Sequence, residues 1–292
     1  MARPRLGIAL GSGSARGWAH IGVLRALQEA GIEPAVVGGT SIGAFVGAAY
    51  ASGYLDKLED WARGLGRRDV LGFFDVGLGG GLIKGEKLLD FAAATFLDND
   101  FADLERAFAC VATDLASGRE IWLRQGPVAA AVRASIALPG LFSPQLLDER
   151  FLVDGGLVNP VPVSLCRVLD ADVVIAVDLG MDMLTALQRR GGKPAPAGGW
   201  RKAVGRWFGR GEGEPLRPSL PDVVINSIAI MQGRISRSRL AGEPADVLVT
   251  PRLGHLNLLD YHRAGEAIAA GRTAMAHMLP LLRSLMDGEG DV

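Results

Sequence analysis

The chain has 292 residues, of which 49% are hydrophobic and 22% charged, and its formal net charge at pH 7 is −1. This composition excludes the disordered and fibrous classes and gives no general reason to expect a nucleic-acid partner. The only two cysteines, Cys110 and Cys166, lie in apolar surroundings and indicate a reduced compartment instead of a disulfide framework. The length predicts one α/β domain with a substantial core.

The N-terminal residues run directly into a predicted strand, without the apolar stretch and cleavage site of a signal peptide. No uninterrupted apolar run approaches the ~18 residues that a membrane span needs. No group of His, Cys and Asp residues has the spacing of metal ligands. The sequence therefore predicts a cytoplasmic protein that needs neither a metal ion nor another cofactor.

Two strand-loop-helix units open the chain. The first consists of a buried strand over residues 6–10 and an amphipathic helix over 18–30. In the second, a strand over 32–38 leads through a tight turn into a helix that begins near residue 44. Two such units in succession predict a parallel sheet with helices packed on it, and both loops should open at the carboxyl edge, where ligands bind.

The turn of the second unit has the sequence Gly39-Thr40-Ser41-Ile42-Gly43. A serine between a strand and a helix is the setting of a nucleophile elbow, whose tightness leaves little room for a Cβ two residues before and two after the serine. Gly39 and Gly43 fit that requirement. Ser41 would lie at a helix N-terminus, where backbone N–H groups favour an alkoxide or oxyanion. These five residues alone fit an ordinary N-cap serine equally well.

The loop of the first unit is rich in small residues and reads Gly11-Ser12-Gly13-Ser14-Ala15-Arg16-Gly17. It does not match a dinucleotide fingerprint, because Arg16 replaces the third glycine and no acid follows the second strand, and it lacks the lysine of a Walker loop. We interpret it as an oxyanion hole in which N–H groups at Gly13 and Ser14 face a substrate oxygen beside Ser41.

Arg16 has three interpretations: it fixes the loop, it meets a phosphate, or it is a surface charge at a helix start. The candidate oxyanion and substrate-binding residues are Gly11, Gly13, Ser14, Ala15 and Arg16.

Further elements are predicted along the rest of the chain. Helices are expected over 56–66, 86–96, 128–138, 221–240 and 261–285, the last bent near Pro280, and strands over 107–113, 120–123, 151–153, 173–179 and 247–249. The strand over 151–153 delivers Asp154 into Gly155-Gly156. An aspartate before two glycines most often stabilises a turn by accepting hydrogen bonds from nearby N–H groups. A strand that ends at the sheet edge beside Ser41 nevertheless makes Asp154 a candidate base.

Four motifs in this order resemble the patatin-like phospholipases, most closely the bacterial group related to the neuropathy target esterase patatin domain. The motifs are Ser14 to Gly17 in the glycine-rich loop, Gly39 to Gly43, Ser135 to Pro144, and Asp154 to Gly156. The resemblance covers roughly residues 5–180 and, more loosely, 225–271.

This resemblance implies an α/β fold, a three-layer sandwich with a mainly parallel central sheet flanked by helices. It also implies a lipid or other acyl-ester substrate and a Ser-Asp dyad without a histidine, in which Ser41 is acylated and Asp154 is the base. The oxyanion site would be formed by Gly13, Ser14 and the neighbourhood of Arg16. Ser12 and Ser14 stand where the family usually has glycine.

The dyad places a physical demand on Asp154. An aspartate with the usual pKa of ~3.9 is a weak base toward a serine hydroxyl. Asp154 must therefore be desolvated, or the alkoxide must be strongly stabilised.

Residues 189–217 differ in composition from the rest of the chain, with eight Lys or Arg, two Glu, eight Gly and three Pro. Such a segment predicts a mobile insertion. Trp200, Trp207 and Phe208 fall on one helical face, with basic residues on others, which favours a transient contact with an anionic membrane surface. A solvated linker that packs its tryptophans locally fits the same composition.

The residues are compatible with two other functions. One is an ordinary α/β-hydrolase triad of Ser41, Asp178 and either His255 or His262, although Ser41 follows only the second strand, earlier than that fold places its nucleophile. The other is a lipid- or nucleotide-sensing module that kept the fold without catalysis.

Overall fold

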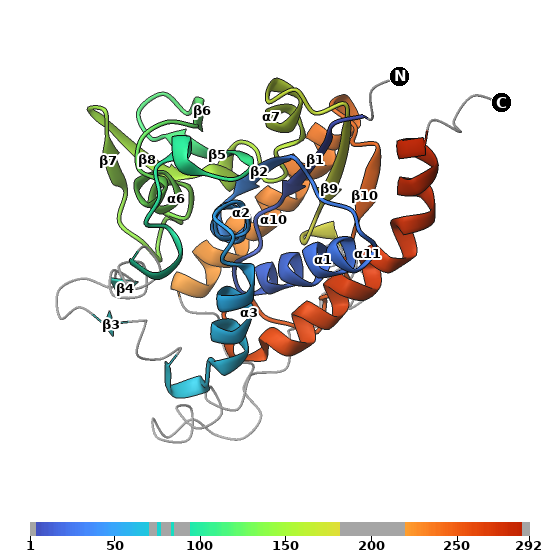
Figure 1. The fold of residues 1–292 in the computed structure, drawn as a ribbon. Helices are drawn as coiled ribbons and strands as arrows, with labels where there is room; N and C mark the ends of the chain where they lie inside the picture. The colour runs from blue at the N-terminus through green and yellow to red at the C-terminus, as the bar shows by residue number, and fades with distance from the viewer. Residues whose placement is uncertain (1–3, 70–74, 77–82, 85–93, 182–219, 288–292) are drawn as a thin grey trace.

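The computed structural model of the chain describes residues 4–69, 75–76, 83–84, 94–181 and 220–287. Within them an eight-stranded sheet runs through the centre with helices on both faces (Figure 1). The predicted α/β architecture, a mainly parallel central sheet flanked by helices, is thereby confirmed.

The sheet has a parallel part and an antiparallel part. The strand order of the parallel part is β10 (Val247–Val249), β9 (Val173–Val177), β1 (Leu6–Leu10), β2 (Val36–Thr40) and β5 (Ala107–Asp114). Beyond β5 the sheet continues antiparallel with β8 (Arg150–Asp154) and β7 (Gln145–Leu147), and β6 (Glu120–Leu123) also pairs with β5. A separate pair is formed by β3 (Asp75–Val76) and β4 (Ile83–Lys84).

The helices follow the sequence pattern closely in most cases. They are α1 (Trp18–Glu29), α2 (Ile42–Ala51), α3 (Leu55–Gly64), α6 (Val128–Ser135), α7 (Val163–Val168), α10 (Leu220–Gly242) and α11 (Ala264–Asp287). Short 3-10 turns, labelled η, are η1 (Ser14–Gly17), η2 (Phe101–Asp103), η3 (Gly155–Leu157) and η4 (Tyr261–Arg263).

Alternate side chains of the central strands point to opposite faces of the sheet, which produces the three layers. On one face Ile8 and Leu10 belong to the core that includes α1, α2 and α11. On the other face Ala9 and Val174 pack with Cys166 of α7, and α10 covers the same side. Figure 1 shows α1 and α11 side by side in blue and red, apart from α7 and α10.

Helices α1 and α11 approach each other at backbone distance. A Cβ added at Gly22 would lie 1.9 Å from the carbonyl oxygen of Ile268, and one added at Gly271 would lie 1.9 Å from that of Ala19. Only glycine fits at such a crossing. The last described helix is thereby joined to the first.

Several element boundaries differ from the prediction, and the second strand and the helix after β6 show why. The second strand was expected over 32–38, but β2 runs from Val36 to Thr40, because the chain first lies alongside β1 at Val36 and Pro34 has no N–H to donate. The helix expected over 128–138 ends at Ser135, after which the carbonyl oxygen of Ala137 accepts from the N–H of Asp154.

Two predictions fall outside the described residues: the insertion at 189–217 and most of the helix over 86–96. The membrane contact assigned to that insertion stays a prediction. In the part of the chain that is described, no helix is long and apolar enough to cross a membrane. The same part holds no cluster of His, Cys, Asp and Glu suited to a metal ion.

Candidate active site

Ser41 lies at the junction between β2 and α2. It is the N-cap residue of α2, with φ 57° and ψ −124°, a backbone conformation that non-glycine residues rarely adopt. A Cβ at Gly39 would lie 2.5 Å from the Cα of Ala44, and one at Gly43 would lie 2.0 Å from the carbonyl oxygen of Leu10. Both glycine positions therefore lack room for a side chain, which is the geometry of a nucleophile elbow.

The sheet register brings Asp154 to the same level as Ser41. In β5, which separates β2 from β8, Val111 pairs with Thr40 and Ala112 pairs with Asp154. The hydroxyl of Ser41 donates a hydrogen bond to Oδ2 of Asp154 at 2.6 Å. The other carboxylate oxygen, Oδ1, accepts from the N–H of Gly156 at 2.7 Å.

Burial changes the acidity of Asp154. The residue is 0% exposed, and loss of hydration raises the pKa of its carboxyl from 3.8 to about 6, although the hydrogen bonds from Ser41 and Gly156 oppose the rise. Near neutral pH the group is ionised and yet a stronger base than an aspartate in water. The structure thus shows the desolvation that a Ser-Asp pair demands.

The glycine-rich loop leaves the sheet beside the elbow, because β1 and β2 are parallel neighbours. It packs against the first turn of α2: a Cβ at Gly17 would lie 2.2 Å from Cγ1 of Ile42. The loop, Ser41 and Asp154 therefore occupy one region at the carboxyl edge of the parallel strands, where α/β proteins place their ligands.

Residues 8–167 match the family model described as patatin-like phospholipase. The chain belongs to the patatin-like phospholipase family. An NTE family protein of Mycobacterium tuberculosis is 34% identical over 331 aligned positions, covering 94% of this chain and 91% of that protein. The lysophospholipase nte1 of Emericella nidulans is 36% identical over 181 positions, which cover 60% of this chain and 12% of the fungal protein.

The crystal structure of VipD from Legionella pneumophila shares the fold. It superposes with a TM-score of 0.58 at 15% sequence identity, covering 97% of this chain and 67% of that one. Together with the family match, the likeness confirms the patatin-like architecture. Membership of this family makes the chain a hydrolase that acts on lipid esters.

Some backbone N–H groups of the glycine-rich loop have hydrogen-bond partners and others do not. Those of Gly11 and Ala15 donate to the carbonyl oxygens of Val177 and Leu258, both at 3.1 Å, and that of Arg16 donates to Gly13 at 3.2 Å. Among the described residues, the N–H groups of Gly13 and Ser14 have no partner. Of the five candidate residues, these two retain an N–H that can meet a substrate oxygen.

Arg16 is buried, with 6% of its surface exposed, so its interpretation as a surface charge is wrong. Its Nε and Nη2 both donate to the carbonyl oxygen of Leu256, at 3.0 and 2.9 Å. The guanidinium therefore fixes the loop to the segment that follows β10.

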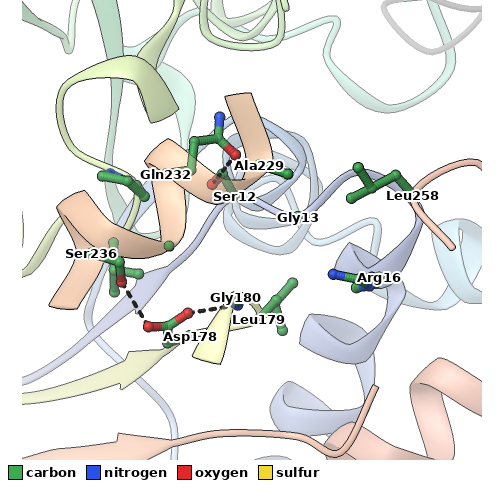
Figure 2. A pocket seen from close by; sticks show the side chains of 13 residues that line it. Ser12, Gly13, Arg16, Asp178, Leu179, Gly180, Ala229, Gln232, Ser236 and Leu258 are labelled. Atoms are coloured by element: carbon green, nitrogen blue, oxygen red, sulfur yellow. Dashed lines mark hydrogen bonds between the residues drawn. The ribbon is translucent and has the colours of Figure 1, made fainter. Parts of the chain in front are cut away.

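A small cavity lies on the side of the loop that faces α10 (Figure 2). Its volume, measured as the space open to the centre of a water molecule, is about 20 Å³, which is room for one water. Ser12 and Gln232 lie along its wall and face each other, with 3.4 Å between their Oγ and Oε1 atoms. The cavity is too small for an acyl chain.

The residues of the alternative triad do not come together. The carboxylate of Asp178 accepts from the hydroxyl of Ser236 and from the N–H of Gly180, both at 2.7 Å (Figure 2). His255 pairs instead with Glu266 at 3.5 Å. No histidine of the described ranges shows a hydrogen bond to Ser41 or Asp178.

Two residues at the site were not among the predicted site residues. Ser135, at the end of α6, accepts the backbone N–H of Ser41 at 2.9 Å, and Tyr261 bonds the hydroxyl of Ser14 at 2.8 Å. Ser135 lay inside a recognised motif, which was a hint of its place. Tyr261 is 247 positions away from its partner and could be found only from the folded chain.

Proposed function

We propose that the chain is a serine lipid acyl hydrolase in which Ser41 is the nucleophile and Asp154 the general base, with an acyl-enzyme intermediate and no cofactor. The observation that carries the proposal is the 2.6 Å hydrogen bond from the Ser41 hydroxyl to a fully buried carboxylate at a strained elbow. The substrate class is a phospholipid, a lysophospholipid or another carboxylic ester of a fatty acid. The lysophospholipase among the relatives supports this class.

In acylation, Oγ of Ser41 attacks the ester carbonyl carbon while its proton moves to Oδ2 of Asp154, along the existing hydrogen bond. The carbonyl oxygen becomes an oxyanion. The N–H groups of Gly13 and Ser14 and the first turn of α2 would stabilise it, because oriented N–H groups cost no reorganisation during reaction. When the intermediate collapses, Asp154 returns the proton to the departing alcohol.

In deacylation the same groups act on water. Asp154, again ionised, takes a proton from a water molecule that attacks the acyl-enzyme at Ser41, and it then gives that proton to Oγ of Ser41 as the fatty acid leaves. The fixed position of Asp154 suits both half-reactions. The N–H of Gly156, at 2.7 Å from Oδ1, and the strand pairing of β8 keep the carboxylate in place.

Turnover of a soluble p-nitrophenyl ester by single variants tests the proposal. Ser41→Ala and Asp154→Asn should each lower kcat by at least about 10³-fold, since each removes a partner of the proton transfer. His255→Asn and His262→Asn are matched controls and should keep kcat within about twofold. Loss of activity in one of these histidine variants at unchanged melting temperature would establish the triad instead, and an inactive wild-type chain that still binds lipid would favour the sensing module.

A further inference from the structure

The glycine-rich loop is hydrogen-bonded to a segment that lies C-terminal to residues 8–167, the range that matches the family model. Between β10 and α11, the carbonyl oxygen of Leu258 accepts from the N–H of Ala15, and that of Leu256 accepts from the side chain of Arg16. In the same segment, the hydroxyl of Tyr261 forms a hydrogen bond with Oγ of Ser14 at 2.8 Å. We call residues 256–261 the loop brace.

Within the braced loop, Ser14 has an unfavourable backbone conformation. Its φ is +52°, in the left-handed region that glycine adopts freely and serine adopts at a cost of roughly 1 kcal/mol. After Ser14, the N–H of Ala15 is hydrogen-bonded to the carbonyl oxygen of Leu258. Before Ser14, the N–H groups of Gly11 and Ser12 donate to the carbonyl oxygens of Val177 and Pro160. Relaxation of φ at Ser14 would therefore rotate the Gly13–Ser14 peptide, whose N–H has no partner among the described residues and whose carbonyl oxygen accepts the N–H of Arg16 at 3.2 Å.

That peptide carries the N–H of Ser14, one of the two N–H groups left for an oxyanion. Its rotation would turn this N–H away from the position that it has in the folded loop. The hydroxyl of Ser14 is the atom through which the side chain can oppose the rotation, and its partner is Tyr261.

Tyr261 is itself well fixed. Its ring meets the ring of Trp18 edge to face, at 6.0 Å between centroids and 73° between planes, and its carbonyl oxygen accepts from Nε1 of Trp18 at 3.2 Å. Burial raises the pKa of its hydroxyl, the hydrogen bond with Ser14 opposes this rise, and the charge of Asp154 adds to it. The phenol therefore stays protonated at neutral pH, and its hydroxyl lies within electrostatic reach of the base.

We infer that Tyr261 is a positioning residue for catalysis, whose hydroxyl holds Ser14 in the left-handed conformation and so keeps the Ser14 N–H directed at the oxyanion. The inference rests on the proposed function of the loop and adds a role for the brace. In this chain a serine-tyrosine hydrogen bond does what a glycine at position 14 would do by its conformational freedom alone.

The experiment is a double-mutant cycle on kcat and KM for the soluble ester, with Tyr261→Phe made in the wild-type chain and in Ser14→Gly. In the wild-type chain, Tyr261→Phe should lower kcat by about tenfold, with KM changed by less than about twofold, because an oriented donor acts on the transition state. In the Ser14→Gly background the same substitution should change kcat by less than about twofold, since glycine needs no support at positive φ. An unchanged kcat in the wild-type chain, or an equal loss in both backgrounds, would overturn the inference.

Two further variants separate this role from general stability. Tyr54→Phe removes a phenol hydroxyl far along the chain from the loop and is expected to leave kcat unchanged. If Ser14→Gly does not fold, Ser14→Ala takes its place: it should lose about the same factor as Tyr261→Phe, and the double variant should lose no more. Multiplying losses in that cycle would contradict the inference.

Ser41→Ala in the same assay distinguishes the two proposals. If Ser41→Ala is inactive and Tyr261→Phe is unimpaired, only the role of Tyr261 fails. If Ser41→Ala stays active, the proposed function fails, and the positioning role fails with it.

Discussion

At the scale of single residues, the chemistry depends on the surroundings of one carboxylate. Asp154 sits at the end of β8 without contact to solvent, and it accepts hydrogen bonds from Ser41 and Gly156. Burial strengthens the base, and the two hydrogen bonds hold it in place. A histidine between nucleophile and carboxylate is therefore unnecessary in principle.

The pH dependence of turnover should report this group. Only ionised Asp154 can accept the proton of Ser41, so kcat/KM should be constant above a pKa of about 6 and fall about tenfold per pH unit below it. A pH–rate profile on a soluble ester measures the midpoint. A rate that stays constant between pH of about 7 and about 5 would contradict the role of Asp154.

Asp154→Asn should stabilise the fold while it removes activity. The folded state binds the Asp154 proton more tightly than the unfolded state, so this group's contribution to stability falls as pH rises from 3.8 to about 6 and stays low above that. The shift corresponds to roughly 3 kcal/mol at 1.36 kcal/mol per pKa unit. Asparagine carries no charge and avoids this cost.

We therefore expect the free energy of unfolding of Asp154→Asn at pH about 8 to exceed that of the wild type by up to about 3 kcal/mol, and the difference to close near pH about 4. Denaturant unfolding at the two pH values measures it. A variant that is less stable than the wild type at the higher pH would show that the buried charge of Asp154 does not lower the free energy of unfolding.

At the scale of elements, the elbow depends on α6 as well as on β2 and α2. Ser135, the last residue of α6, is fully buried, and its hydroxyl accepts the N–H of Ser41. This contact crosses from the antiparallel side of the sheet to the nucleophile. It fixes the peptide that precedes the strained Ser41 conformation.

Ser135→Ala should lower the free energy of unfolding by about 1–3 kcal/mol, because it leaves a buried N–H without an acceptor. It should also lower kcat, since the nucleophile loses a support. The matched control is Ser52→Ala, which removes a hydroxyl that has no hydrogen-bond partner among the described residues and should be nearly neutral. Equal unfolding midpoints for the two variants would contradict the role of Ser135.

The elements of the site were largely predictable from the sequence. The positions of Ser41 and Asp154 at the ends of strands were predicted, because each follows a short apolar strand, Ser41 lies between Gly39 and Gly43, and Asp154 precedes Gly155 and Gly156. β7 and α7 were missed, since three and six residues carry too little periodicity. The partners Gln232 and Tyr261 could not be found in this way, because contacts over more than 200 positions leave no local pattern.

At the scale of the whole molecule, the C-terminal part of the chain supports the N-terminal catalytic part. α11 packs along α1 through glycines at the crossing, and α10 lies along η3, which begins directly after Asp154. Two strand-loop-helix units predicted a parallel sheet with helices packed on it, and the family resemblance implied the three layers. The approach of α1 and α11 was not, because a helical glycine looks the same in sequence whether or not a backbone lies against it.

Gly271→Ala should destabilise the fold by at least about 2 kcal/mol, since its Cβ would lie 1.9 Å from the carbonyl oxygen of Ala19, and backbone cannot yield as a side chain does. Gly265→Ala in the same helix is the control. Its Cβ would meet only the end of the Arg63 side chain at 3.5 Å, so this variant should be neutral or slightly stabilising. Thermal unfolding of both variants measures the difference, and similar melting temperatures would contradict the close packing of α1 and α11.

Covalent capture of the nucleophile is the sharpest test of the Ser41–Asp154 dyad. The chain is treated with a fluorophosphonate, digested, and the modified residue is located by peptide mass spectrometry. We expect one adduct, on Ser41, which is absent from Ser41→Ala and forms at least about 10²-fold more slowly in Asp154→Asn, because the base that activates the hydroxyl is gone. An adduct on another serine, or undiminished labelling of Ser41→Ala, would contradict the role of Ser41 as the nucleophile.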